Sequence, residues 1–329
     1  MKNYQEITQE ELVRSKGILD RINDYYFSKM VGQRDLSVSL LVSMMCNGHI
    51  LLESVPGLAK TTAAKTVTEA VNGTFSRVQC TPDLLPSDIV GTQIFNYSTN
   101  TFETKLGPVN ANFLLLDEIN RSSAKTQSAM LEVMQEQQVT IGAEQFDMPD
   151  VFMVIATQNP IEQEGTYLLS EAQLDRFIIK EIINYPSKED ECQILNRIED
   201  KVFDSKTSVA TLEDVKFLQE LVERVYIDDS IKKYIVDIVD ATRHPGDFID
   251  KNMADYVTLG ASTRGAINLM LVAKAVAVLN GRNHVIPDDV KALIHSVLRH
   301  RITLNYAAVA DGVTEEQIID AIVGVIQTP

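Results

Sequence analysis

Five short apolar runs in the first half of the chain, each about as long as a β-strand, limit the possible folds more than any other feature. Several are apolar almost throughout, as strands buried on both faces are. Helix-like patterns fall between most of them, which predicts a parallel sheet in an α/β layer fold. The expected strands are HILLE (49–53), FSRVQC (75–80), NFLLLD (112–117), VFMVIAT (151–157) and FIIKEII (177–183).

Two inserts interrupt this alternation. Residues 91–108 pair two short β-like runs around a Ser-Thr-Asn tip, and residues 138–148 do the same around Gly142. Both patterns predict hairpins. They are either ordinary surface decoration or surfaces that face a substrate or partner.

The second half of the chain shows helical patterns only. The segments SIKKYIVDIVDATR (230–243) and PDDVKALIHSVLRHR (287–301) each place their apolar residues on one helix face. Thr314 and Gln317 have the spacing of a capping box for a last helix. We place a domain boundary near residue 186. It divides an α/β core (1–185), with an N-terminal helical segment and both hairpins, from a helical domain (186–329).

The charge balance argues against whole classes of partner. The chain has 329 residues with 30 basic and 46 acidic side chains, a formal net charge of −16. Such a field repels phosphate backbones and anionic lipids, so we expect no membrane insertion, and it disfavours general nucleic-acid binding while leaving a local basic channel open. The apolar stretch LSVSLLVSMMC (36–46) is too short to cross a bilayer and predicts a buried helix.

The cysteines and histidines predict no metal centre built from these residue types. Cys46, Cys80 and Cys192 are far apart and have no metal-like spacing, and the five histidines form no pair at helical ligand spacing. Unpaired cysteines and the absence of an apolar signal core fit a reduced, cytoplasmic compartment.

The segment ESVPGLAKTT (53–62) resembles a phosphate loop of the pattern G-x-x-x-x-G-K-[ST], with Ser54 and Ala59 in place of two glycines. It follows the first expected strand and opens a helix, where backbone N–H groups bind phosphate. Lys60 would reach the β- and γ-phosphates and Thr61 would bind Mg²⁺. The alternative is a chance strand–turn–helix. The expected nucleotide-binding residues are Val55, Pro56, Gly57, Leu58, Ala59, Lys60, Thr61 and Thr62.

Polar side chains follow two of the other expected strands. FLLLDE ends in Asp117, which would hold Mg²⁺ through water, and in Glu118, which would polarise the attacking water. VIATQNP ends in Asn159, which would position that water. The alternatives are an acidic pair that caps the next helix and an asparagine that starts a turn before Pro160.

At this point the residues resemble a known family. The runs TPDLLPSDIVGTQIFN, GPVNANFLLLDEINRSSAKTQSAMLEVMQEQQVTIG and VIATQNPIEQEGTYLLSEAQLDRF, with GASTRG and VLRHRI later on, resemble the MoxR family of AAA+ ATPases. The magnesium-chelatase ATPase subunit shares the general plan but is less similar in these segments. The resemblance implies a P-loop NTPase core of three αβα layers, a helical lid, and a hexameric ring with ATP and Mg²⁺ at each interface.

The resemblance also implies roles for single residues. Lys60 and Thr61 match Walker A, Asp117 and Glu118 match Walker B, and Asn159 matches sensor 1.

Two arginines and a glycine–glutamine pair complete this match. Arg176 matches the arginine finger that reaches a neighbouring subunit, Arg264 matches sensor 2, and Gly32 and Gln33 match the segment near the adenine. Each arginine has a plainer alternative. Arg176 would pair with an acidic neighbour, Glu171 or Asp175, and Arg264 would be a solvated residue at a helix start. Arg121 would either face the interface or serve a surface or capping role.

The chain departs from the family pattern at three positions. Ser54 stands where the family usually has glycine, whereas Ala59 is the family's own residue. Thr263 and Gly265 replace the proline and alanine of the usual GASPRA, which predicts a looser helix start around Arg264. These changes bear on nucleotide affinity and turnover more than on the fold.

The sequence therefore predicts a Mg²⁺-dependent ATPase that remodels or activates a client protein, or helps to insert a metal or cofactor. By resemblance, a protein with a von Willebrand factor A domain is an expected partner. The alternative from another class is a nucleotide-gated interaction module with little or no hydrolysis. The acidic charge disfavours a third option, a ring that translocates DNA or RNA.

Overall fold

The structure, a computed structural model, describes residues 6–160, 166–199 and 207–329. These residues form two compact units. An α/β unit comprises Asp20–Phe177 and Glu181–Lys216, and a helical unit comprises the described residues up to Leu19 together with Ile178–Lys180 and Phe217–Pro329. Part of one MoxR-like run, residues 161–165, lies outside the described residues. A compact unit is not by itself an independently folding domain, so the domain boundary near residue 186 stays a prediction.

The α/β unit is built on a five-stranded sheet of order β2-β5-β8-β1-β9. The pairs β1–β8, β5–β8 and β2–β5 are all parallel, as the sequence predicts. Strand β2, which follows β1 in the sequence, lies three places away from β1 in the sheet, and the later strands β5 and β8 return towards β1. The connection after β1 therefore begins where the direction of the strand order changes. The strands are β1 (Ile50–Glu53), β2 (Phe75–Gln79), β5 (Phe113–Asp117), β8 (Met153–Gln158) and β9 (Ile179–Ile182).

Burial along the strands follows their place in the sheet. The central strands β5 and β8 are almost entirely buried, which explains their continuous apolar sequences. Strand β2 lies at the edge and is only partly buried. Its exposed positions carry Arg77 and Gln79, which are two positions apart, so both side chains leave the same face of the strand.

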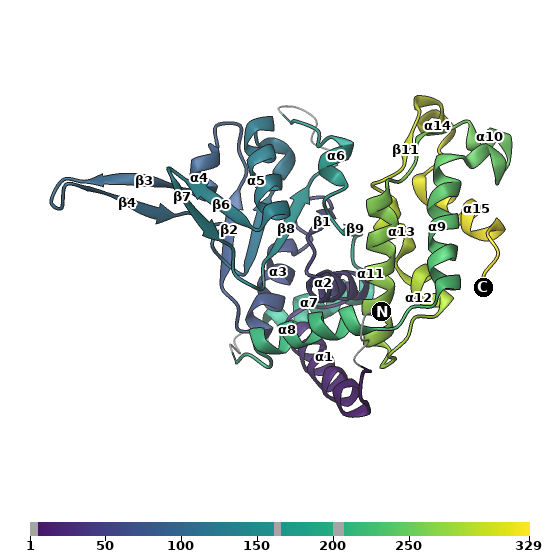
Figure 1. Ribbon diagram of the computed structural model, residues 1–329, viewed down its shortest axis with the longest axis horizontal. Coiled ribbons are helices and arrows are strands. Elements are labelled where there is room, and N and C mark those ends of the chain that lie inside the picture. Colours follow the sequence, from purple (N-terminus) through teal and green to yellow (C-terminus); the bar gives the residue numbers. More distant parts are fainter. Residues whose placement is uncertain (1–5, 161–165, 200–206) are drawn as a thin grey trace. The chain divides into compact units, whose positions relative to one another are not determined.

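Helices cover both faces of the sheet, which confirms the three-layer αβα arrangement (Figure 1). On one face Met130 and Leu131 of α5 pack in one cluster with Leu114 and Leu116 of β5. On the other face Phe113 lies against Gly73, just after α3. The helices of this region are α1 (Gln9–Lys29), α2 (Arg34–Met45), α3 (Lys60–Ala70), α4 (Pro86–Val90), α5 (Ala124–Glu136), α6 (Glu171–Leu174) and α7 (Lys188–Glu199), with a 3₁₀ turn at Ile119–Arg121.

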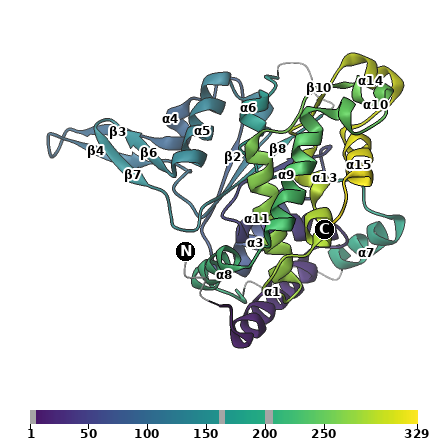
Figure 2. The same cartoon turned by 45° about the vertical axis from the view of Figure 1, so that its right-hand side comes forward.

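Both predicted hairpins are confirmed, and they project from the same side of the α/β unit (Figures 1 and 2). Strand β3 (Gly91–Asn96) pairs with β4 (Thr101–Leu106), and β6 (Gln138–Ile141) pairs with β7 (Glu144–Asp147). The hairpins contact each other, because the Thr104 hydroxyl donates to Glu144 Oε2 at 3.0 Å.

The helical unit confirms the expected amphipathic helix over 230–243 and the capping box at Thr314. In the described ranges no helix is long and apolar enough to cross a bilayer. The helices of this half of the chain, of which α8 begins in the α/β unit, are α8 (Leu212–Arg224), α9 (Asp229–Arg243), α10 (Lys251–Ala254), α11 (Thr263–Leu279), α12 (Pro287–Ala292), α13 (Ile294–Leu298), α14 (Tyr306–Asp311) and α15 (Glu315–Val325), with a 3₁₀ turn at Pro245–Asp247.

Two expectations for this half of the chain are wrong in detail. Residues 287–301 form two helices, not one, because Leu293 between α12 and α13 has a non-helical backbone (φ −126°, ψ 23°). The break lets α12 pack on α11 while α13 also reaches α15. The unit also contains a short antiparallel pair, β10 (Val257–Leu259) and β11 (Thr303–Leu304), which is too short to give a periodic sequence signal.

A buried histidine joins three elements of the α/β unit. His49, directly before β1, donates from Nε2 to the Met134 carbonyl at the end of α5 and accepts at Nδ1 from the Val154 N–H of β8, both at 3.0 Å. Burial lowers the pKa of His49 to about 4. The ring is therefore neutral in the folded protein at neutral pH.

We predict that His49 makes the α/β unit less stable in mild acid. Its folded pKa lies below its unfolded value of 6.5, so the unfolded chain takes up the proton first. The stabilisation is complete above pH 6.5 and is lost as the pH falls towards 4, by at most roughly 1.4 kcal/mol per pH unit. Denaturant unfolding of His49→Gln between pH 4 and 7 should show a shallower pH slope than wild type. His284→Gln, at an exposed position, should keep the wild-type slope, and equal slopes in all three proteins would contradict this role.

Candidate functional site

The loop between β1 and α3 has the backbone of a phosphate-binding turn. Gly57 adopts a positive φ of 88°, and α3 begins at Lys60 immediately after the loop. The Ser54 N–H donates to the Gln158 carbonyl at 3.2 Å, which ties the start of the loop to the end of β8. The loop therefore lies at the carboxyl edge of the sheet, where open α/β sheets bind ligands.

The two positions that lack the usual glycine differ in strain. Ala59 adopts a left-handed conformation (φ 54°, ψ 25°), which costs a non-glycine residue roughly 1–2 kcal/mol. Ser54 has no positive φ. It is buried, and its hydroxyl donates to the Val55 carbonyl at 3.0 Å. The departure from the family pattern at Ser54 is thus accommodated without strain, and the strained position is Ala59.

We predict that Ala59→Gly raises the free energy of unfolding by about 1 kcal/mol, because glycine adopts the left-handed region without a steric penalty. Ser54→Gly is the matched comparison. It removes a hydrogen bond and adds backbone freedom without relieving strain, so it should lower stability or leave it unchanged. Denaturant titrations of the two variants measure both effects. A larger gain for Ser54→Gly than for Ala59→Gly would contradict the assignment of strain.

The predicted pair Asp117 and Glu118 lies at the end of β5 and is held by a residue of β8. The Thr157 hydroxyl donates to Asp117 Oδ1 at 2.8 Å and accepts from the Glu118 N–H at 2.8 Å. Glu118 itself has a left-handed backbone (φ 58°). Thr157 is fully buried. Its role was not predicted from the sequence, because the sequence alone does not separate a threonine that bonds to a site residue from one that only packs in a buried strand.

Side chains from β2 contact both carboxylates. Arg77 donates to Asp117 Oδ2 from Nη2 at 2.6 Å and from Nε at 3.3 Å. Gln79 Nε2 donates to Glu118 Oε2 at 3.0 Å, and Arg121 Nη1 donates to the same oxygen at 3.0 Å. The sequence left an interface role and a surface or capping role open for Arg121. In the structure its side chain bonds to Glu118 of its own chain. The alternating polar residues of FSRVQ were the sequence signal that could have pointed to Arg77 and Gln79.

Three further predicted site residues belong to the start of α3 and to the end of β8. Lys60 Nζ donates to the Ser54 carbonyl at 3.3 Å, so its side chain folds back over the loop. Thr61 is half-buried in the first turn of α3, and Asn159 is buried directly after β8. All three thus belong to elements that meet at the carboxyl edge of the sheet.

An apolar cavity of about 330 Å³ lies beside the phosphate loop. Its volume falls in the range of small-molecule sites. Gly32 and Gln33 both have left-handed backbones, and Gln33 Nε2 donates to the Asn184 carbonyl at 3.0 Å. Of the expected nucleotide-binding residues, Gln33, Gly57, Leu58, Ala59 and Thr62 line the cavity. Residues that the sequence interpretation missed are Lys29, Met30, Val31, Pro186, Ile194 and Ile198.

The two predicted arginines lie in different units. Within the described residues, Arg176 donates to Gln135 Oε1 at 3.3 Å and to the Ala172 carbonyl at 2.9 Å, rather than to Glu171 or Asp175. Arg264 belongs to the helical unit, near the start of α11, where the Ser262 hydroxyl accepts from its N–H at 3.0 Å. Gly265 is buried and closely packed, since a Cβ there would lie 3.1 Å from Ala261 Cβ. The helix start is thus capped and packed.

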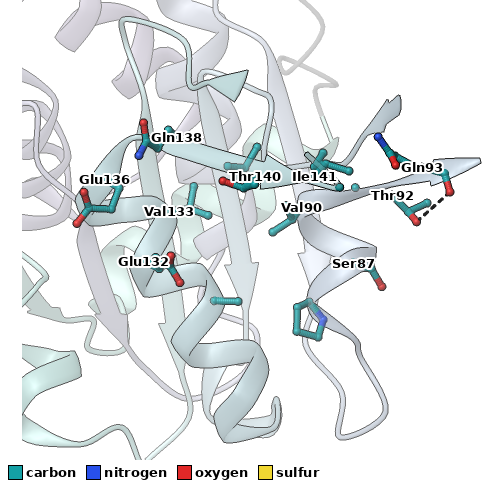
Figure 3. Close-up of a pocket in the computed structure, with 15 residues that line it drawn as sticks. Ser87, Val90, Thr92, Gln93, Glu132, Val133, Glu136, Gln138, Thr140 and Ile141 are labelled. Carbon is teal, nitrogen blue, oxygen red and sulfur yellow. Dashed lines mark hydrogen bonds between the residues drawn. The ribbon is translucent and has the colours of Figure 1, made fainter. Parts of the chain in front are cut away.

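A second cavity, of about 550 Å³, lies away from the phosphate loop between α4, α5 and the two hairpins (Figure 3). Val90, Val133 and Ile141 contribute apolar surface. Of the described residues that line it, Glu132 and Glu136 of α5 are the charged ones.

The donor set beside the phosphate loop fits Mg²⁺. Thr61 offers a hydroxyl and Asp117 a carboxylate, and Mg²⁺ prefers such oxygen ligands and retains several waters when it binds with a phosphate. Among the described residues no group of three or more His, Cys, Asp or Glu side chains could hold a metal ion.

The chain resembles known ATPases over both units. Residues 49–179 match the family described as "ATPase family associated with various cellular activities (AAA)", and residues 249–322 match the "AAA lid domain". The fold, the phosphate loop and these matches define an AAA-type ATPase core followed by a lid.

Individual relatives narrow this class. The chain is 46% identical over 300 residues to Chaperone MoxR1 of Mycobacterium tuberculosis, covering 91% of this chain and 79% of that protein. It is 45% identical over 303 residues to YeaC of Bacillus subtilis, covering 91% of each. A solved Cytophaga hutchinsonii structure, provisionally named an ATPase, has a TM-score of 0.92 at 44% identity over 97% of both chains. The chain belongs to the MoxR family of AAA+ ATPases.

Proposed function

We propose that this protein is a Mg²⁺-dependent ATPase that remodels or activates a client protein, or assists insertion of a metal or cofactor. One observation carries the proposal: the phosphate loop and both carboxylates meet at one edge of the sheet. Ser54 ties the loop to β8, and Thr157 of β8 bonds to Asp117 and to the backbone of Glu118. Such a meeting of a phosphate loop with an acidic strand end suits phosphoryl transfer to water.

Each residue has a distinct role in this proposal. Lys60 and the N–H groups at the start of α3 bind the phosphates. Thr61 and Asp117 hold Mg²⁺, which neutralises charge on the phosphate oxygens when bound. Glu118 polarises the attacking water, and Asn159 positions it. The apolar cavity beside Gly57 takes the adenine.

We predict that Glu118→Gln lowers steady-state phosphate release by at least about 10²-fold while nucleotide binding persists, because a carboxamide cannot accept the proton of the attacking water. Phosphate release and the fluorescence of a bound ATP analogue measure the two properties separately. Glu10→Gln, at an exposed position of α1, serves as the control for a lost carboxylate. Equal and negligible phosphate release by wild type and Glu118→Gln, with binding intact, would instead favour a nucleotide-gated interaction module.

We extend the proposal to a hexameric ring in which Arg176 acts on the neighbour's nucleotide. The guanidinium bonds to a neutral amide and a carbonyl, and its residue is only half-buried. No carboxylate among the described residues therefore holds it in an ion pair. An arginine finger of this kind stabilises the charge on the transferred phosphoryl group.

Mixed rings test this role. We predict that Arg176→Ala and Lys60→Ala each lose ATPase activity, by about 10³-fold or more for the arginine. Mixing the two variants should restore activity, because a Lys60→Ala subunit then offers Arg176 to an intact neighbouring site. Lys60→Ala mixed with the double variant Lys60→Ala/Arg176→Ala is the control, and it should stay inactive. A mixture of the two single variants with no more activity than that control would place the action of Arg176 within its own subunit.

The lid and the hairpins serve communication in this proposal. Arg264 of the helical unit serves as the sensor 2 residue that the family resemblance implies, so that hydrolysis changes the lid. The β3–β4 hairpin carries an exposed aromatic group in which Phe95 stacks edge-on against Tyr97 and Phe102, with ring centroids 5.1 Å apart in each pair. Exposed aromatic residues are typical of contact surfaces. The partner class is a protein with a von Willebrand factor A domain, and the compartment is the cytoplasm.

A further inference from the structure

Arg77 bonds to the carboxylate that the proposed function assigns to Mg²⁺. The guanidinium makes two hydrogen bonds to Asp117 Oδ2, the shorter at 2.6 Å, while Thr157 donates to Oδ1. Both oxygens of Asp117 therefore already have a donor, and its negative charge is matched by a positive one. The inference drawn from this contact rests on the proposed function.

Arg77 is far more exposed to solvent than the carboxylate that it bonds to. Its side chain is 48% exposed, whereas that of Asp117 is only 13% exposed. Arg77 Nη2 also donates to Gln79 Oε1 at 3.1 Å. Arg77 can therefore leave Asp117 without becoming buried and unpaired, because water and Gln79 remain available to it. Asp117, by contrast, cannot turn to solvent while Thr157 holds its other oxygen.

A guanidinium and a divalent cation compete for one carboxylate. The guanidinium fills lone pairs of Oδ2 that would otherwise accept from the waters of Mg²⁺, and its charge repels the metal. Lysine at position 77 would keep the charge but lose the planar, forked geometry.

The geometry points to a metal-competing role for Arg77: it neutralises Asp117 in the absence of Mg²⁺ and sets the Mg²⁺ concentration at which the nucleotide site fills. Arg77 is a positioning residue in this role, since it acts through Asp117. Without the metal, Arg77 holds Asp117 in place and compensates its charge. When Mg²⁺ and nucleotide bind, the guanidinium leaves Asp117. Free Mg²⁺ alone then binds weakly.

The test measures binding rather than turnover. Binding of N-methylanthraniloyl-ADP is followed by fluorescence at fixed nucleotide while Mg²⁺ is raised from an EDTA baseline. We expect Arg77→Gln to lower the half-saturating Mg²⁺ concentration by about three- to tenfold relative to wild type. Arg77→Lys should fall between the two. Lys125→Gln, which removes an exposed positive charge from α5, should match wild type.

A second comparison separates competition from a general change of charge. In an Asp117→Asn background the guanidinium has no carboxylate to occupy, so adding Arg77→Gln should leave the Mg²⁺ dependence unchanged. Circular dichroism checks that each variant is folded. An unchanged or raised half-saturating Mg²⁺ concentration in Arg77→Gln would overturn the proposed competition. So would a decrease of this concentration by Arg77→Gln that is equally large in the Asp117→Asn background.

Failure of the proposed function gives a different result. Wild-type protein that binds no nucleotide at any Mg²⁺ concentration, or binds it without regard to Mg²⁺, would overturn the proposed function and the role of Arg77 with it. Wild-type binding that depends on Mg²⁺ but is insensitive to Arg77 would overturn the role of Arg77 alone.

Discussion

One buried hydroxyl holds the site together. Thr157 bonds to the side chain of Asp117 and to the backbone of Glu118, so the ends of β5 and β8 have a fixed relation. The same strand β8 receives the Ser54 N–H from the phosphate loop. Because β8 lies between β5 and β1, it is the one strand that can connect the acidic residues with the loop. Loss of that hydroxyl would leave Asp117 with a single remaining partner in a mostly buried position.

In the phosphate loop, the position that departs from the sequence pattern is not the position whose backbone conformation favours glycine. Judged by the pattern, Ser54 is the unusual residue, yet its backbone needs no glycine. Ala59 matches the family, yet it carries the strain of a left-handed conformation. Strain at functional loops is common, because the surrounding structure over-determines the conformation. Here the first turn of α3 follows at once and fixes Ala59 in place.

The sequence was sufficient for elements whose signals are local and long enough. The buried strands β1, β5 and β8 are continuous apolar runs, and both hairpins have recognisable tips. It was insufficient where a contact depends on strand order. Arg77 meets Asp117 only because β2 pairs with β5, and no spacing in the sequence encodes that register. Ile194 and Ile198 likewise line the cavity because α7 folds back onto the loop, and the break at Leu293 reflects packing against two different helices.

The location of β2 has a mechanical consequence. As an outermost strand it is bonded to the sheet along one side only, so displacing it breaks a single ladder of hydrogen bonds. The chain continues from β2 through α4 directly into the β3–β4 hairpin. A displacement of this strand would therefore also move the start of the chain segment that leads to the hairpin, whose tip projects away from the sheet (Figure 1). The strand that carries Arg77 is thus also the edge strand whose chain leads into the hairpin.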